Sequence, residues 1–215
     1  MWAGVSTLLG QMVLSPMAAL TPYDLDETYQ HVWKANIFDH GSAKDINTAL
    51  IVGLAKGLQK GSNWESVKTA MRLMDPYHFN EVPFTTRRLN THLDSVETFV
   101  NDSEGVVAHL FERLEKRTET REWWNAWLPM QVVLATAAIT NYDPLASMQL
   151  CIEFGHDTDS YAQLAGAYFG AIHGASIFPE EMKNTVRQRL IEDYNHDPEE
   201  LINVLHEAHL KKHVR

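Results

Sequence analysis

Apolar side chains recur along this chain at intervals of three and four residues, the spacing of helices that bury one face. In residues 45–58, for example, Ile46, Leu50 and Leu54 share one side of a predicted helix. Strand-like alternation of apolar and polar residues is absent from the sequence. The pattern therefore predicts an all-α fold, with helices at residues 26–38, 45–58, 63–74, 89–100, 106–114, 130–139, 144–154, 160–174, 180–194 and 198–209.

Short turns separate these segments, and no stretch rich in Gly, Ser or Pro divides the chain. We therefore expect residues 1–215 to form a single helical domain, with residues 76–86 as the longest loop. Thr21 followed by Pro22 predicts an N-cap with proline at the first helical position. Residues 1–20 are apolar, but Gly and Pro interrupt them and no Lys or Arg precedes them, so we expect an internal helix rather than a secretory signal.

Composition narrows the possible partners. The formal net charge of −10 argues against a broad surface for nucleic acid or for an anionic membrane, because both need Lys and Arg clusters to meet phosphate. No uninterrupted run of 18 apolar residues exists, so no membrane span is expected. Cys151 is the only cysteine, which excludes an intrachain disulfide and favours a reducing compartment, the cytoplasm. Because its neighbours are apolar, we expect Cys151 to pack in the core.

Residues 155–160, with the sequence Gly-His-Asp-Thr-Asp-Ser, carry the strongest chemical signal. Asp157, Asp159 and Ser160 place two carboxylates and a hydroxyl on a turn that opens a predicted helix, and Mg²⁺ prefers such oxygen ligands. The alternative is ordinary helix capping, with Asp157 as the N-cap and Asp159 in the first turn. A cap needs one side-chain oxygen, whereas this turn supplies three.

Three glycines, Gly166, Gly170 and Gly174, follow the turn at four-residue intervals. Glycine inside a helix costs about 1 kcal/mol relative to alanine, so three of them suggest a packing demand. We expect this stripe to bring the helix close to neighbouring chain, with no room for side chains.

Together, these features resemble the C-terminal signature of the ADP-ribosylglycohydrolase family. That signature reads Gly-x-Asp-Thr-Asp-Thr, followed by a helix rich in Ala and Gly and then by a proline, which is Pro179 here. Weaker matches extend to residues 39–45, 127–129 and 143–154. The resemblance implies an orthogonal helical bundle of this family's type, a pair of Mg²⁺ ions in a cleft, and hydrolysis of an N- or O-glycosidic bond to ADP-ribose or a related ribosyl group.

The resemblance also implies roles for individual residues. Asp157 and Asp159 match the family's two metal-ligating aspartates, and Ser160 stands where threonine is usual. His156 replaces a common glycine and adds bulk beside the site. Asp39, before an apolar helix, lies in a segment that the resemblance places near the cleft, which makes it the candidate for acid–base catalysis. Helix capping is the alternative role for this polar segment.

The sequence departs from the family in one respect. The family also uses a Thr-Asp-Asp triplet near its N-terminus to bind the metals, and no Asp-Asp pair occurs in this sequence. We therefore expect the family's N-terminal helices to be missing and the Mg²⁺ site to be partial. Two functions remain open: a Mg²⁺-dependent hydrolase, or a non-catalytic truncated or split member that binds a ligand, associates with itself, or assembles with a chain that completes the fold.

Two further clusters have competing interpretations. His206, His209 and His213 fall at i, i+3 and i+7 and could bind a transition metal, but a solvent-exposed face near a Lys-rich end is the simpler interpretation. The second cluster comprises three tryptophans that could stack on a base, although large aromatics near a helix start more often cover a core: Trp123, Trp124 and Trp127.

Overall fold

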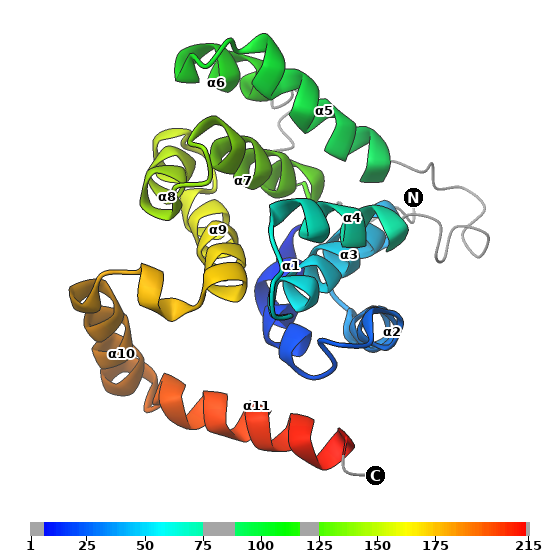
Figure 1. The fold of residues 1–215 in the computed structure, drawn as a ribbon, viewed down its shortest axis with the longest axis vertical. Coiled ribbons are helices and arrows are strands. Elements are labelled where there is room, and N and C mark those ends of the chain that lie inside the picture. The colour runs from blue at the N-terminus through cyan, green and yellow to red at the C-terminus, as the bar shows by residue number, and fades with distance from the viewer. Residues whose placement is uncertain (1–6, 75–88, 117–124, 214–215) are drawn as a thin grey trace.

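A computed structural model describes residues 7–74, 89–116 and 125–213 (Figure 1). Every regular element within these ranges is helical, so the all-α prediction is confirmed. The elements in chain order are α1 (Leu9–Leu14), the 3-10 helix η1 (Ser15–Ala19), α2 (Leu25–Ala35), α3 (Gly41–Gly57), α4 (Trp64–Met74), α5 (Leu89–Asp102), α6 (Val107–Glu115), α7 (Trp127–Ile139), α8 (Pro144–Glu153), α9 (Thr158–His173), the 3-10 helix η3 (Ala175–Ile177), α10 (Glu180–Tyr194) and α11 (Pro198–His213).

Two apolar helices, α3 and α7, form the centre of the fold. Twelve of the 17 residues of α3 and ten of the 13 residues of α7 are buried. Helices that are apolar all round are covered on every side. In this protein α1, α2, α4 and η1 pack on α3, while α5, α6 and α8 pack on α7.

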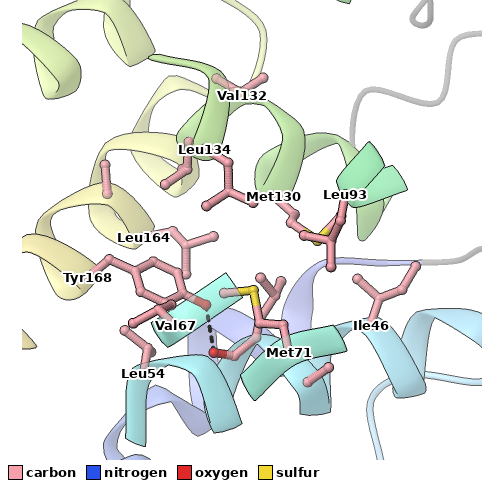
Figure 2. Packing of buried hydrophobic residues seen from close by; sticks show 14 of the residues in the cluster. Ile46, Leu54, Val67, Met71, Leu93, Met130, Val132, Leu134, Leu164 and Tyr168 are labelled. Atoms are coloured by element: carbon pink, nitrogen blue, oxygen red, sulfur yellow. Dashed lines mark hydrogen bonds between the residues drawn. The ribbon is translucent and has the colours of Figure 1, made fainter. Parts of the chain in front are cut away.

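Helix α9 joins the two halves of the core because it packs against both α3 and α7. The buried Tyr168 hydroxyl of α9 donates a hydrogen bond of 2.6 Å to the Leu50 carbonyl oxygen of α3. Figure 2 shows this bond beside Leu54, Met71 and Leu164, from α3, α4 and α9. The turn at the start of α9 is thus attached to a helix that is fixed in the core.

Local signals placed most helix ends within two residues. Helix α2 ends at Ala35 rather than residue 38, α11 ends at His213 rather than residue 209, and three further differences concern helix starts. The N-cap of α2 is Asp24, whose carboxylate accepts a hydrogen bond from the Glu27 N–H at 2.9 Å, and not Thr21 as predicted. The buried Thr21 hydroxyl instead lies 2.9 Å from that of Thr28. Helix α3 begins at Gly41 rather than residue 45, and α7 at Trp127 rather than residue 130. The predicted loop at residues 76–86 lies outside the described residues.

The predicted close packing at the glycine stripe of α9 is wrong. A Cβ atom at Gly166 would lie 3.5 Å from Met148 Cε, and one at Gly170 would lie 3.6 Å from Phe178 Cε2, both ordinary van der Waals distances. Gly174 ends the helix with φ of +83°, which glycine adopts without strain. None of these positions forbids a side chain because of a close neighbouring backbone.

The close approach occurs instead at two glycines of α3. A Cβ atom at Gly57 would lie 3.1 Å from the Cβ of Ala171 in α9. At Gly53 it would lie 2.5 Å from Met71 Cε and 3.1 Å from the Tyr168 hydroxyl. Where α3 meets α4 and α9, the helix that needs small residues is therefore α3. Gly10 of α1 is tighter still, since a Cβ there would lie 2.1 Å from Asp39 Oδ2.

The last two helices lie apart from the core. Figure 1 shows α10 and α11 along one edge of the molecule, beyond α9. No residue of α10 is buried, and α11 packs only lightly, on η1. Arg187 of α10 pairs with Asp197 at 2.7 Å and with Glu199 at 2.6 Å, which ties the two helices together at their junction.

No helix in the described ranges is long and apolar enough to cross a membrane.

Candidate functional site

The turn between α8 and α9 holds all three residues that the sequence predicts as metal ligands. Gly155 and His156 have φ of +88° and +58°, so two consecutive left-handed residues reverse the chain before α9. Only glycine adopts this conformation freely, although histidine tolerates it better than most residues do. A glycine at position 156 would adopt this conformation without strain.

The carboxylate of Asp157 does not act as an ordinary helix cap. Asp157 occupies the N-cap position of α9, yet its side chain accepts no backbone hydrogen bond there. It interacts with the side chains of Ser160 and Asp159 instead. Asp157 therefore stands at the N-cap position but lacks the side-chain hydrogen bond that the capping interpretation requires. Its carboxylate forms a cluster with the side chains of Asp159 and Ser160.

Burial sets the protonation of this cluster. Desolvation raises the pKa of the Asp157 carboxyl, the hydrogen bond with Ser160 lowers it, and hydrogen bonding and charge repulsion from Asp159 raise it further. Asp159 is exposed, whereas Ser160 is buried beneath the turn. A bound cation would offset both the desolvation of Asp157 and the repulsion from Asp159, and would therefore favour the ionised Asp157 carboxylate.

Apolar packing beneath the turn holds it in position. The ring of Phe154 lies 5.3 Å from that of Phe111 and 5.4 Å from that of His156. Tyr161, fully buried one turn into α9, hydrogen-bonds the Asp157 backbone, and burial raises its phenol pKa. The turn is therefore anchored on both sides, by α8 and by α9.

The donor set fits one magnesium ion better than two. Mg²⁺ in proteins commonly binds one or two carboxylates and keeps several water or substrate ligands, which matches Asp157, Asp159 and the Ser160 hydroxyl. Among the described residues, no group of three or more His, Cys, Asp or Glu side chains is arranged to hold a metal ion. A second ion would need ligands beyond those that this part of the chain supplies.

The raised pKa of Asp157 predicts a pH-dependent stability in the absence of metal. A raised folded-state pKa favours the protonated fold, so stability is full below about the ordinary value of 3.8 and falls as the pH rises through the raised pKa. Asp157→Asn cannot ionise and should avoid this loss. With a chelator present, we expect the variant to melt above wild type at pH 7.5 and level with it near pH 3.8. A variant that melts below wild type at pH 7.5 would contradict the effect.

Comparison with known proteins decides the family. The model of the family described as ADP-ribosylglycohydrolase matches residues 3–212. The chain belongs to the ADP-ribosylglycohydrolase family. No curated protein and no solved structure gives a match. The predicted family is therefore confirmed over nearly the whole chain, and not only over the C-terminal signature.

Asp39, the candidate for acid–base catalysis, lies in a buried environment away from solvent. Its carboxylate is 2% exposed and accepts four hydrogen bonds. The donors are the Thr7 hydroxyl at 2.6 Å, the Gly10 N–H at 2.9 Å, the Asn36 amide at 2.9 Å and the Asn47 amide at 2.6 Å. These contacts describe a structural carboxylate that joins α1 to α3. The acid–base role expected from the sequence stays a prediction.

The buried polar network around Asp39 was not predicted from the sequence. Gln11 of α1 donates a hydrogen bond from Nε2 to Asn47 Oδ1 at 3.0 Å, and both side chains are buried. The only signal was the presence of these polar residues on otherwise apolar helix faces. The network links three segments that lie far apart in the sequence.

The other residues singled out in the sequence, Cys151, the tryptophans and the histidines, lie in different environments. Cys151 is buried against the Thr136 hydroxyl, and burial raises its thiol pKa to about 11, so its expected packing role is confirmed. Trp127 stacks on His92 with ring centroids 5.3 Å apart, whereas Trp123 and Trp124 lie outside the described residues. His209 is not simply solvated as expected, because its Nδ1 lies 3.3 Å from the Leu20 carbonyl oxygen and its ring lies 6.2 Å from that of Tyr23.

Proposed function

We propose that this ADP-ribosylglycohydrolase binds Mg²⁺ at the turn before α9 and hydrolyses a glycosidic bond to ADP-ribose or a related ribosyl group. One observation carries the proposal: Asp157 stands at the N-cap of α9 without capping it, and its carboxyl interacts with Ser160 and Asp159 instead. The helix dipole favours negative charge there, which helps the Asp157 carboxyl to ionise once a cation binds. The family match supports the reaction class.

In this proposal, each residue of the turn has a task. The carboxylates of Asp157 and Asp159 would hold the ion, and the Ser160 hydroxyl would add a neutral oxygen. When bound, Mg²⁺ would supply positive charge that stabilises developing negative charge during cleavage. The His156 side chain is exposed beside the carboxylates and would limit which acceptor groups approach the site. The proposed compartment is a reducing one such as the cytoplasm, because Cys151 is the only cysteine. We propose no nucleic-acid or membrane partner, because the net charge is −10.

A second candidate function is non-catalytic. Within the described residues, no third acidic side chain joins the turn, and Asp39 is held by four hydrogen-bond donors. A turn with too few ligands for a metal pair would bind a single ion and an ADP-ribosyl ligand without cleaving it. In that case the protein would be a ligand-binding or assembly module of the family.

The first test is Mg²⁺ binding, measured by calorimetry and by the rise in melting temperature. We expect Asp159→Ala to abolish the Mg²⁺-dependent rise. Asp26→Ala is the matched control, because Asp26 is likewise an exposed aspartate in the first turn of a helix, α2. A full Mg²⁺ response in Asp159→Ala would remove the turn from both candidate functions.

The second test separates the two functions. Release of ADP-ribose from ADP-ribosylated arginine and serine substrates is measured with and without Mg²⁺, for wild type and for Asp157→Ala. Mg²⁺-dependent turnover that Asp157→Ala lacks establishes the hydrolase. Mg²⁺ and ADP-ribose binding without turnover establishes the non-catalytic module instead.

A further inference from the structure

Helices α10 and α11 form an arm whose apolar side chains are not buried by the rest of this chain. Eight large apolar side chains of the arm are 41–67% exposed: Met182, Val186, Ile191, Tyr194, Leu201, Ile202, Val204 and Leu210. Helices of this length are marginal in water without tertiary packing. The arm therefore needs a surface to cover it.

The exposed area matches what a stable dimer requires. Burying a whole aliphatic side chain removes roughly 60–120 Å² from water, so eight half-exposed ones offer roughly 250–500 Å². A standard interface buries about 800 Å² on each partner, and somewhat more than half of that area is apolar. Half of these side chains, Met182, Val186, Ile191 and Tyr194, belong to α10. Helix α10 therefore supplies roughly 125–250 Å² of this apolar area, and the rest lies beside it on α11.

The sequence of α10 is complementary to a second copy of itself. Lys183, Val186, Leu190 and Asp193 follow one another at i, i+3, i+7 and i+10, so they form one stripe with the spacing of a helix–helix seam. Val186 is 54% exposed and Asp193 is exposed, while Lys183 and Leu190 are partly exposed. In this stripe, an apolar centre has a positive charge at one end and a negative charge at the other.

We infer that the protein forms a twofold-symmetric dimer in which the two α10 helices pack antiparallel across this stripe. When the twofold axis passes Gln188, Val186 of each copy meets Leu190 of the other, and Lys183 meets Asp193, because each pair is equidistant from Gln188. A twofold interface uses every contact twice, so the seam gains two apolar layers and two ion pairs. The inference is independent of the proposed hydrolysis.

Charges near the stripe are compatible with this packing. Lys183 already pairs with Glu180 in its own helix, and an ammonium group has three donors, so it can also reach a carboxylate of the second copy. Arg187 is occupied by Asp197 and Glu199. The net charge of −10 opposes association at long range, but at physiological salt this repulsion is screened beyond about 8 Å. The ion pairs between Lys183 and Asp193 of the two copies therefore dominate the electrostatics of the seam.

Sedimentation equilibrium of the full chain tests the dimer. At about 100 µM we expect a mass twice the 24.5 kDa of one chain. Lys183→Glu and Asp193→Lys should each raise the dissociation constant about 10- to 100-fold, because like charges then face each other at both ends of the seam. The double variant restores both pairs with reversed polarity and should return to within about threefold of wild type.

A matched control separates the seam from general charge effects. Glu181→Lys makes the same charge change as Asp193→Lys on the same helix, but off the stripe, and should leave the dissociation constant unchanged. Circular dichroism checks that each variant keeps its helices. A wild type that stays monomeric at this concentration overturns the inference. A dimer that the single variants leave intact, or that the double variant fails to restore, overturns the α10 seam.

Discussion

Asp39→Ala is expected to lower the free energy of unfolding by about 3–5 kcal/mol. The substitution removes the buried Asp39 carboxylate, and four hydrogen-bond donors lose their acceptor. These donors are the Thr7 hydroxyl, the Gly10 N–H and the side-chain amides of Asn36 and Asn47. Each buried donor that loses its acceptor costs about 1–3 kcal/mol, less whatever an entering water recovers. For a chain of this size, the melting temperature should fall by about 6–20 °C.

Asp39→Asn is the matched control for this prediction. The amide keeps the shape and one acceptor oxygen but places an NH₂ group against other donors, so we expect about half of the loss. Thermal melting and urea unfolding measure both variants. The same experiment tests the acid–base role: a variant that keeps wild-type stability while losing turnover would contradict the structural role and restore Asp39 as a catalytic group.

Gly53→Val is expected to destabilise the protein by about 2–4 kcal/mol, although valine is the better helix former. A Cβ at Gly53 meets Met71 Cγ at 3.0 Å and the Tyr168 hydroxyl at 3.1 Å. Met71 can bend away, but Tyr168 can move only by giving up its hydrogen bond to the Leu50 carbonyl oxygen. The loss comes from both overpacking and a broken buried hydrogen bond.

Gly170→Ala is the matched comparison for Gly53→Val, because the glycine spacing had predicted close packing at Gly170. The new methyl group would find only Phe178 Cε2 at 3.6 Å, an ordinary contact, and alanine lowers the entropy lost on helix formation. We expect a gain of about 0.5–1 kcal/mol in urea unfolding. A large loss at Gly170 together with tolerance at Gly53 would reverse the assignment of the close-packed helix.

Patterns that depend on neighbouring residues were readable from the sequence. The bounds of α10 agree with the prediction, and α4 and α8 differ from it by one residue, because acidic first turns, Asn63 and Pro144 mark their starts locally. The turn of Asp157, Asp159 and Ser160 was readable for the same reason, since three oxygen groups lie within four residues. Local spacing was sufficient wherever the contacts themselves are local.

Features that depend on distant segments were not readable. The four donors to Asp39 come from α1, α3 and the loops beside them, and no periodicity pairs Gly10 with Asp39 across 29 positions. The glycine stripe failed for a related reason: spacing reports that small residues share a face, but only the packed structure shows what lies opposite. The raised pKa of Asp157 likewise depends on burial in the folded chain, which composition does not reveal.

The burial of Cys151 allows its thiol to report local opening of the helices beneath the Asp157 turn. The Cys151 thiol in α8 is fully buried and hydrogen-bonded to the Thr136 hydroxyl of α7. It also lies close enough to Tyr161 of α9 to contribute to the raised pKa of the Tyr161 phenol. A thiol reagent can reach it only when these helices separate, so the labelling rate measures the free energy of that opening. Because the chain has no other cysteine, a single labelled species in the mass spectrum measures how often α8 separates from α9. Slower labelling in the presence of Mg²⁺ would report the tightening of this scaffold directly, without a substrate.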